Sequence, residues 1–215
     1  MSTLSKLVLG VMGQLRPRPA KGDAATTIAL PAPGRAGGMP LMEAFALRRS
    51  SREFAPDALP LPLLSNLLWA AWGVNREGGG RTAPSALDAQ EIDVYVALPA
   101  GAYRYDAAGH ALELVAAADL RRITGYQDFV DEAPLDLVYV AEHRRMSMVP
   151  VAQRVSFASA AAGAIAQNVY LFAAASGLAT VIRAWIDRDA IAAGLGLAHD
   201  QQVLLSQTVG YPPRA

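Results

Sequence analysis

The run Arg48-Arg49-Ser50-Ser51-Arg52 brings together side chains that could bind an anion. Three guanidiniums and two hydroxyls in one short stretch can clamp a phosphate, because arginine pairs bidentately with phosphate oxygens. The same run is also typical of a solvated helix end, where cations complement the helix dipole. Taken alone, the run favours the solvated helix end over the phosphate site.

Two further segments could direct polar groups at a ligand. Thr82-Ala83-Pro84-Ser85-Ala86 follows a glycine-rich loop at 77–80, and a Pro-Ser pair at the start of an element can orient a hydroxyl and backbone N–H groups. Ile182-Arg183-Ala184 ends a predicted strand, just before Trp185. An ordinary turn, and a strand that leaves the core with Arg183 in water, explain these segments without any ligand.

The stretch from Gly163 to Thr180 begins with a predicted helix that has one face of very small side chains. Another backbone could approach this face closely. Gln167 and Asn168 need hydrogen-bond partners if they are buried. A core helix under a sheet and a helix at a dimer interface both fit the pattern, and the two are compatible.

The composition excludes several classes of function. The chain has no cysteine, which excludes disulfides, cysteine-ligated metals and thiol nucleophiles, and its three histidines form no metal-binding pattern. Nineteen basic and nineteen acidic side chains balance, which argues against a nucleic-acid binder held by bulk charge. No G-x-G-x-x-G or Walker motif is present, so the usual nucleotide cradles are missing.

A length of 215 residues, 53% of them hydrophobic, indicates one domain with a sizeable core. Hydrophobic periodicity predicts helices near 41–48, 62–72, 117–124, 155–176 and 188–194. Strands are predicted at 92–98, 102–105, 111–115, 135–141, 178–184 and 202–209, with a hairpin turn at 106–109. Because helices and strands mix without strict βαβ alternation, we expect an α+β fold.

Proline and glycine clusters predict an extended N-terminal arm over residues 1–40, before a domain over 41–215. Residues 155–182 carry no charge and are long enough to span a bilayer. They are mostly Ala, Ser and Gly, so a buried helix followed by a strand is predicted instead of a membrane span. The apolar run at 7–12 is too short for a signal-peptide core, which predicts a cytoplasmic protein, with a weak or truncated export signal left open.

Taken together and in order, these motifs resemble the nitroreductase family, and most closely its branch that includes SagB-type dehydrogenases. The resemblance runs from about Ile28 to Pro213. It rests on three main segments and five shorter ones: 48–54, 67–73, 81–86, 103–105, 133–135, 163–171, 177–180 and 209–212. It implies a mixed, mainly antiparallel sheet surrounded by helices, an intertwined homodimer, and one FMN at each end of the subunit interface.

The resemblance also implies which residues bind FMN. Its phosphate, ribityl chain and pyrimidine oxygens would be held by four hydroxyl or guanidinium groups: Arg48, Arg49, Ser50 and Arg52. Three consecutive residues of the partner subunit would cover the flavin: Pro84, Ser85 and Ala86. Asp88 and Gln90 stand where many relatives carry Asn and Gln, and Asp88 would accept a hydrogen bond from flavin N3–H.

The strand end at Ile182, Arg183 and Ala184 corresponds to the segment whose backbone N–H approaches flavin N5. A guanidinium beside N1 and C2=O, from Arg52 or Arg183, would stabilise reduced flavin. Arg214 resembles a basic residue near the phosphate. No catalytic acid, base or nucleophile is expected, because the flavin performs the hydride chemistry.

The implied activity is ping-pong hydride transfer from NAD(P)H through flavin N5 to a quinone, a nitroaromatic or a similar small aromatic acceptor. Two alternatives stay open: a SagB-type dehydrogenase that oxidises azoline rings in a modified peptide, and a non-catalytic flavin-binding module. The azoline reading is the weaker, because relatives that do this are expected to use a Lys-Tyr pair. The only lysines of this chain are Lys6 and Lys21.

Overall fold

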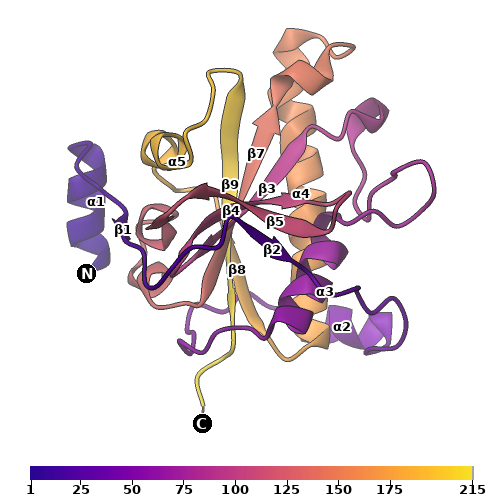
Figure 1. Ribbon diagram of the computed structural model, residues 1–215, viewed down its shortest axis with the longest axis horizontal. Helices are drawn as coiled ribbons and strands as arrows, with labels where there is room; N and C mark the ends of the chain where they lie inside the picture. Colours follow the sequence, from indigo (N-terminus) through magenta and orange to yellow (C-terminus); the bar gives the residue numbers. More distant parts are fainter. Residues whose placement is uncertain (215) are drawn as a thin grey trace.

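The computed structural model describes residues 1–214, and its centre is a seven-stranded sheet with helices on both faces (Figure 1). The order across the sheet is β2-β5-β4-β3-β7-β9-β8. The strands are β2 (Thr27–Ala29), β3 (Ile92–Leu98), β4 (Gly101–Asp106), β5 (Ala111–Ala116), β7 (Leu135–Glu142), β8 (Ala179–Arg183) and β9 (Gln201–Gly210). Every neighbouring pair runs antiparallel, which confirms an α+β fold with a mainly antiparallel sheet.

One face of the sheet is covered by α2 (Leu41–Leu47), α3 (Leu61–Trp72) and α4 (Val151–Ala175). Leu67 and Leu68 of α3 are fully buried against this face, together with Ala162 and Ile165 of α4. The small side chains of α4 allow the helix to lie close to the strands. This confirms the interpretation of α4 as a core helix.

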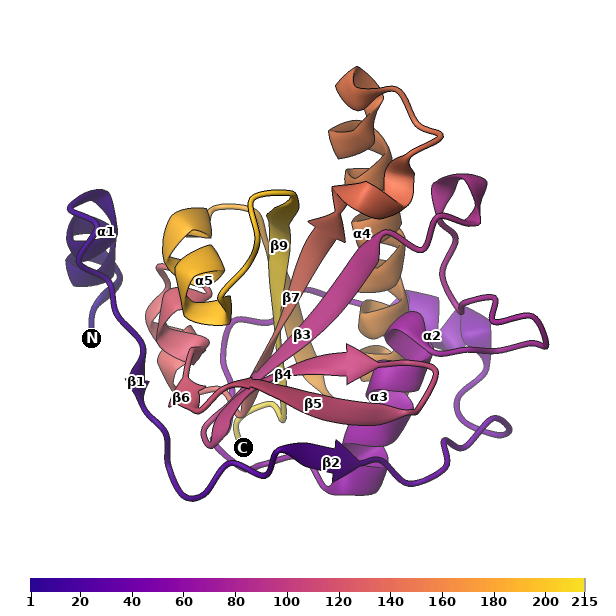
Figure 2. The same cartoon turned by 45° about the horizontal axis from the view of Figure 1, so that its top comes forward.

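The opposite face carries α5 (Arg188–Leu195), α1 (Thr3–Val11) and the segment that joins β5 to β7 (Figure 2). That segment contains two short 3-10 helices, η2 (Arg121–Ile123) and η3 (Asp128–Asp131). A second core forms where Ile191 of α5 and Ile123 of η2 pack on Tyr95 and Val140 of the sheet. The chain thus has three layers, with the sheet in the middle.

Two glycines set the ends of the helices that border the candidate site. At Gly73, which ends α3, a Cβ atom would lie 2.3 Å from the ring of Trp69, so no other residue fits without moving that ring. Gly177 follows α4 with a φ of +67°, a conformation that glycine adopts without strain. The chain enters β8 directly after this turn.

The N-terminal 40 residues are not simply extended. Residues Thr3–Val11 form α1, Arg18–Pro19 form β1 beside β6 (Ala118–Asp119), and β2 joins the edge of the main sheet. Proline and glycine clusters mark the turns between these short elements but carry no information about their tertiary partners. The division into an arm and a domain at residue 41 remains a prediction.

The helix expected at 117–124 was wrong. This stretch contains β6 and the single turn η2 instead. Asp119 accepts hydrogen bonds from the backbone N–H and the guanidinium of Arg121, and such local bonds compete with a regular helix.

Helix α4 is long and apolar enough to cross a membrane by length and composition. Its inner face is packed against α3 and the sheet, as expected for the core helix of a globular domain. The structure therefore supports the reading of residues 155–182 as a core helix followed by a strand.

Candidate active site

The arginine run leaves the end of α2 and turns toward β8. The N–H of Arg48 still donates to the carbonyl of Ala44 at 2.9 Å, and the helix ends there. The N–H of Ser51 donates to the carbonyl of Thr180 in β8 at 3.0 Å. This backbone bond places the arginine run beside β8, the strand that leads into the second segment singled out in the sequence, 182–184.

Tyr170 of α4 contacts both the arginine run and the strand end at 182–184. Its hydroxyl lies 2.8 Å from Oγ of Ser50 and accepts a hydrogen bond from the N–H of Ile182 at 3.0 Å. The guanidinium of Arg48 lies over its ring, 5.3 Å from the centroid. The motif at 167–171 was noted in the sequence, but no role was predicted for Tyr170. A single tyrosine on an alanine-rich helix gives no local signal for this role.

These residues line a cavity of about 460 Å³. Its polar wall is formed by Arg48, Arg49, Ser51, Tyr170 and Thr180. Its apolar wall comes from the last turns of α4, and Gly177 and Pro212 form the rim. The cavity combines guanidiniums, a hydroxyl and an apolar surface, which are the groups that an anionic, partly aromatic ligand needs.

The three guanidiniums of the arginine run form no close ion pair within the described chain. Within residues 1–214, none of the guanidiniums of Arg48, Arg49 and Arg52 has a carboxylate oxygen within 4.0 Å. Arg49 and Arg52 are exposed, and Arg48 is half-buried. Such a cluster suits a ligand that carries its own negative charge, such as a phosphate.

Arg52 lies at a neighbouring cavity of about 340 Å³. The opposite wall belongs to η3, through Asp128 and Phe129. The rings of Phe129 and Phe54 are in contact, with centroids 5.4 Å apart. The arginine run therefore borders the η3 segment as well as β8.

Residues 84–90 lie elsewhere on the molecule. Oγ of Ser85 accepts from the N–H of Gln90 at 2.8 Å, and Oε1 of Gln90 accepts from Nε of Arg81 at 2.9 Å. Asp88 and Gln90 have φ values of +51° and +48°, a backbone that few side chains adopt without strain. Both line a separate cavity of about 330 Å³. The single chain does not bring this segment to the arginine cavity.

The strand end at Ile182–Ala184 carries one charged side chain, that of Arg183. The side chain of Arg183 is buried and forms an ion pair with Asp136 at 2.9 Å, with Thr208 as a further partner. Burial lowers the pKa of the Arg183 guanidinium. Its side chain therefore does not lie in water, so that interpretation was wrong. A role for its guanidinium beside flavin N1 and C2=O remains a prediction. The role of the Ile182–Ala184 backbone remains a prediction.

Arg214 is exposed, and its guanidinium lies 3.4 Å from the carboxylate of Asp57. It lines a shallow cavity of about 400 Å³ whose rim, at Gly177 and Pro212, is shared with the arginine cavity. Arg214 thus stands on the same side of the molecule as the arginine cavity, but the described side chain does not line it.

Comparison with known proteins places this chain among proteins of one family. A model of the nitroreductase family matches residues 46–211. The chain is 33% identical over 144 residues to MJ1384 of Methanocaldococcus jannaschii, which is named as a candidate nitroreductase, and the match covers 62% of this chain and 73% of the relative.

Solved structures agree with the sequence matches. The crystal structure of a candidate nitroreductase from Ralstonia eutropha JMP134 is 55% identical, covers 94% of this chain and 96% of its own, and has a TM-score of 0.90. One chain of the Escherichia coli microcin synthetase McbBCD complex shares the fold alone, with 19% identity, coverage of 99% and 93%, and a TM-score of 0.68. With the family model matching more than half of its length, this chain belongs to the nitroreductase family of oxidoreductases.

Proposed function

We propose that this chain is an FMN-dependent oxidoreductase that passes a hydride from NAD(P)H, through flavin N5, to a quinone, a nitroaromatic or a similar small aromatic acceptor. The observation that carries the proposal is the cavity of about 460 Å³ beside β8, with guanidiniums that have no carboxylate partner. FMN brings a phosphate dianion and a flat ring, which match the polar and apolar walls of this cavity.

Different residues would bind different parts of the cofactor. Arg48, Arg49 and Arg52 would hold the phosphate and the polar edge of the cofactor through charge-assisted hydrogen bonds. Tyr170 orients Ser50 and the N–H of Ile182, and it keeps the arginine run against β8. Bound FMN would supply the two-electron chemistry, so that the chain itself contributes position, electrostatics and exclusion of water.

The same proposal includes a homodimer with one FMN at each end of the interface. The face of α2 and α4 away from the sheet exposes large apolar side chains, with Met42 at 76%, Phe45 at 47% and Val155 at 46% exposure. A Cβ atom at Gly163 would meet no atom within 4 Å, so the middle of this face is open. A second copy seated here would bury these side chains. Its segment 84–90 would then cover the first copy's cavity.

The first test is whether the purified protein holds a flavin and whether nicotinamides reduce it. We expect a yellow protein that releases FMN on denaturation and loses its flavin absorbance when NADH or NADPH is added without oxygen. A colourless protein that ignores added FMN would contradict the proposal. A flavin that neither nicotinamide reduces would favour the non-catalytic flavin-binding module.

The second test addresses the arginine cluster. The double substitution Arg49→Ala and Arg52→Ala should weaken FMN binding, since each charge-assisted hydrogen bond contributes about 1.5–3 kcal/mol. Fluorescence titration of the apoprotein with FMN measures the change. Arg16→Ala is the matched control, because among residues 1–214 the Arg16 guanidinium donates only to the carbonyls of Gly13 and Leu15. Equal FMN affinity in both variants would mean that the cluster is merely solvated.

A further inference from the structure

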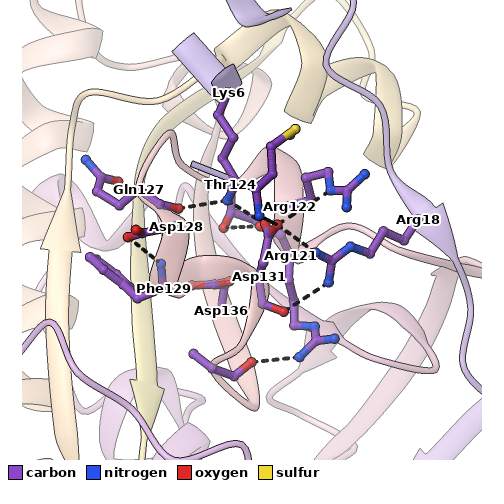
Figure 3. A network of polar contacts seen from close by, with 12 residues as sticks. Lys6, Arg18, Arg121, Arg122, Thr124, Gln127, Asp128, Phe129, Asp131 and Asp136 are labelled. Carbon is purple, nitrogen blue, oxygen red and sulfur yellow. Dashed lines mark hydrogen bonds and ion pairs between the residues drawn. The ribbon is translucent and has the colours of Figure 1, made fainter. Parts of the chain in front are cut away.

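Helix α1 is fastened to the segment before β7 by a buried charge network (Figure 3). Lys6 is fully buried, and its Nζ donates to the carbonyl of Gln127 at 2.7 Å and lies 2.5 Å from the carboxylate of Asp131. Arg18 approaches the same carboxylate at 2.6 Å, and Arg122 at 3.6 Å. The network therefore ties the N-terminal segment to η3 and to the loop that precedes it.

A second contact joins α1 to the same region without any charge. A Cβ atom at Gly10 would lie 2.5 Å from Cε1 of Tyr126 and 3.2 Å from a carboxylate oxygen of Asp187. The backbone of α1 thus lies directly against the ring of Tyr126. Even a methyl group at position 10 would have to displace that ring.

Tyr126 in turn supports an exposed aromatic side chain. The rings of Tyr126 and Trp185 are 5.5 Å apart and tilted by 58°. Tyr126 is only 8% exposed, whereas Trp185 is 59% exposed. A large apolar ring held in solvent by a buried neighbour is a surface on which another flat ring can stack.

Two aromatic side chains therefore flank the strand end at Ile182–Ala184. Trp185 follows Ala184 directly, and the ring of Phe129 lies 5.5 Å from the guanidinium of Arg183. Trp185 packs on Tyr126, which α1 contacts, and Phe129 belongs to η3, which the Lys6 network holds. The family model begins at residue 46, so α1 lies outside the range that it matches.

We propose that α1 positions a wall for the aromatic acceptor: Lys6 and Gly10 hold η3 and Tyr126 so that the free face of Trp185 stands beside the strand end and stacks on a planar acceptor. This inference rests on the proposed function, which places flavin N5 at that strand end. Trp185 determines specificity for flat acceptors. Lys6 is a positioning residue that acts through Gln127, Asp131 and the segment that contains Tyr126.

The oxidative half-reaction separates acceptor binding from the reaction with NAD(P)H. Photoreduced FMN-loaded protein is mixed in a stopped-flow instrument with a naphthoquinone, which can stack, or with ferricyanide, which cannot. In Trp185→Ala and Lys6→Met we expect the half-saturating naphthoquinone concentration to rise by about three- to tenfold, as for the loss of an aromatic pair. The rates with ferricyanide and the FMN affinity should stay the same.

Lys21→Met is the matched control, because Lys21 is the other lysine and is exposed. Gly10→Ala tests the same link without touching a buried charge, in case Lys6→Met folds poorly. If naphthoquinone saturation is unchanged in Trp185→Ala, the acceptor wall is refuted. Equal slowing with ferricyanide would also refute it, since a general loss of structure would then explain the effect.

A measurement without flavin keeps this inference distinct from the proposed function. Trp185 is the most exposed tryptophan, so iodide quenching of tryptophan fluorescence reports its position. We expect altered quenching in Lys6→Met and Gly10→Ala, with no change in Lys21→Met. Unaltered quenching in both variants would overturn the positioning role of α1 whether or not the protein binds FMN. A protein that takes up no FMN would overturn the proposed function, and with it the acceptor wall.

Discussion

Two cationic clusters in this chain have similar composition and opposite surroundings. Arg48 and Arg49 line one cavity and Arg52 lines a neighbouring one, and none of the three has a carboxylate within 4.0 Å among residues 1–214. Lys6 and Arg18 instead converge on Asp131, whose side chain is only 3% exposed. A buried charge needs a counterion within the fold, whereas a cation that stays hydrated does not, and it can pair with an anion from solution. The comparison therefore separates cations that are paired within the fold from cations that remain available to an external anion.

The largest effect is expected when the counterion of the buried cluster is removed. Asp131→Ala leaves Lys6 buried without a carboxylate, and breaking such a pair costs about 3–5 kcal/mol. Urea unfolding should show this loss in the free energy of unfolding. Asp128→Ala is the control, because Asp128 is an exposed neighbour in the same short helix. If Asp131→Ala lowers the free energy of unfolding no more than the small change in Asp128→Ala, the network contributes little to stability.

The open cluster can be tested through the hydroxyl that holds it. Tyr170→Phe keeps the ring but removes the partner of Ser50 and leaves the N–H of Ile182 unpaired. We expect FMN binding to weaken by about 0.5–1.5 kcal/mol, the usual contribution of one neutral hydrogen bond. Tyr105→Phe removes a different buried hydroxyl, which is bound to His110, and should leave FMN binding unchanged.

The smallest effect is expected at the ion pair between exposed Arg144 and buried Glu142. The hydrogen bond from Arg144 holds the pKa of Glu142 below its ordinary value of 4.5. Because the folded state favours the charged carboxylate, this contribution to stability is complete above pH 4.5 and is lost as the pH falls through the lowered pKa. Arg144→Ala should raise the pKa of Glu142 in an NMR titration. An unchanged pKa would show that the pair is not formed in solution.

Much of the fold follows from local patterns. Alternating apolar residues predict β3 over Ile92–Leu98, and the structure has those bounds. Helical spacing from Pro62 to Trp72 predicts α3, which begins one residue earlier. Periodicity succeeds for α3 because the helix buries one regular face, whereas β3 lies at the centre of the sheet with both of its faces buried. It failed at 117–124, where bonds between Asp119 and Arg121 determine the backbone.

The candidate site was predicted only in part. The arginine run and the strand end after β8 were identified separately, and the structure joins them through the bond from Ser51 to Thr180. Tyr170 was missed because a tyrosine on an alanine-rich helix has no distinctive pattern. The side chain of Arg183 was misplaced, because the buried carboxylate that pairs with it, Asp136, lies on another strand.

The sequence by itself determined the family, the α+β class and the absence of cysteine chemistry, because these depend on motif order, periodicity and composition. Only the tertiary structure decided which cations have partners. Lys6 and Asp131 are separated by more than a hundred residues, and nothing local to either one indicates that they meet. Burial and pairing are properties of the packed chain, so the distinction between a cation paired within the fold and one left in solvent appears only after folding.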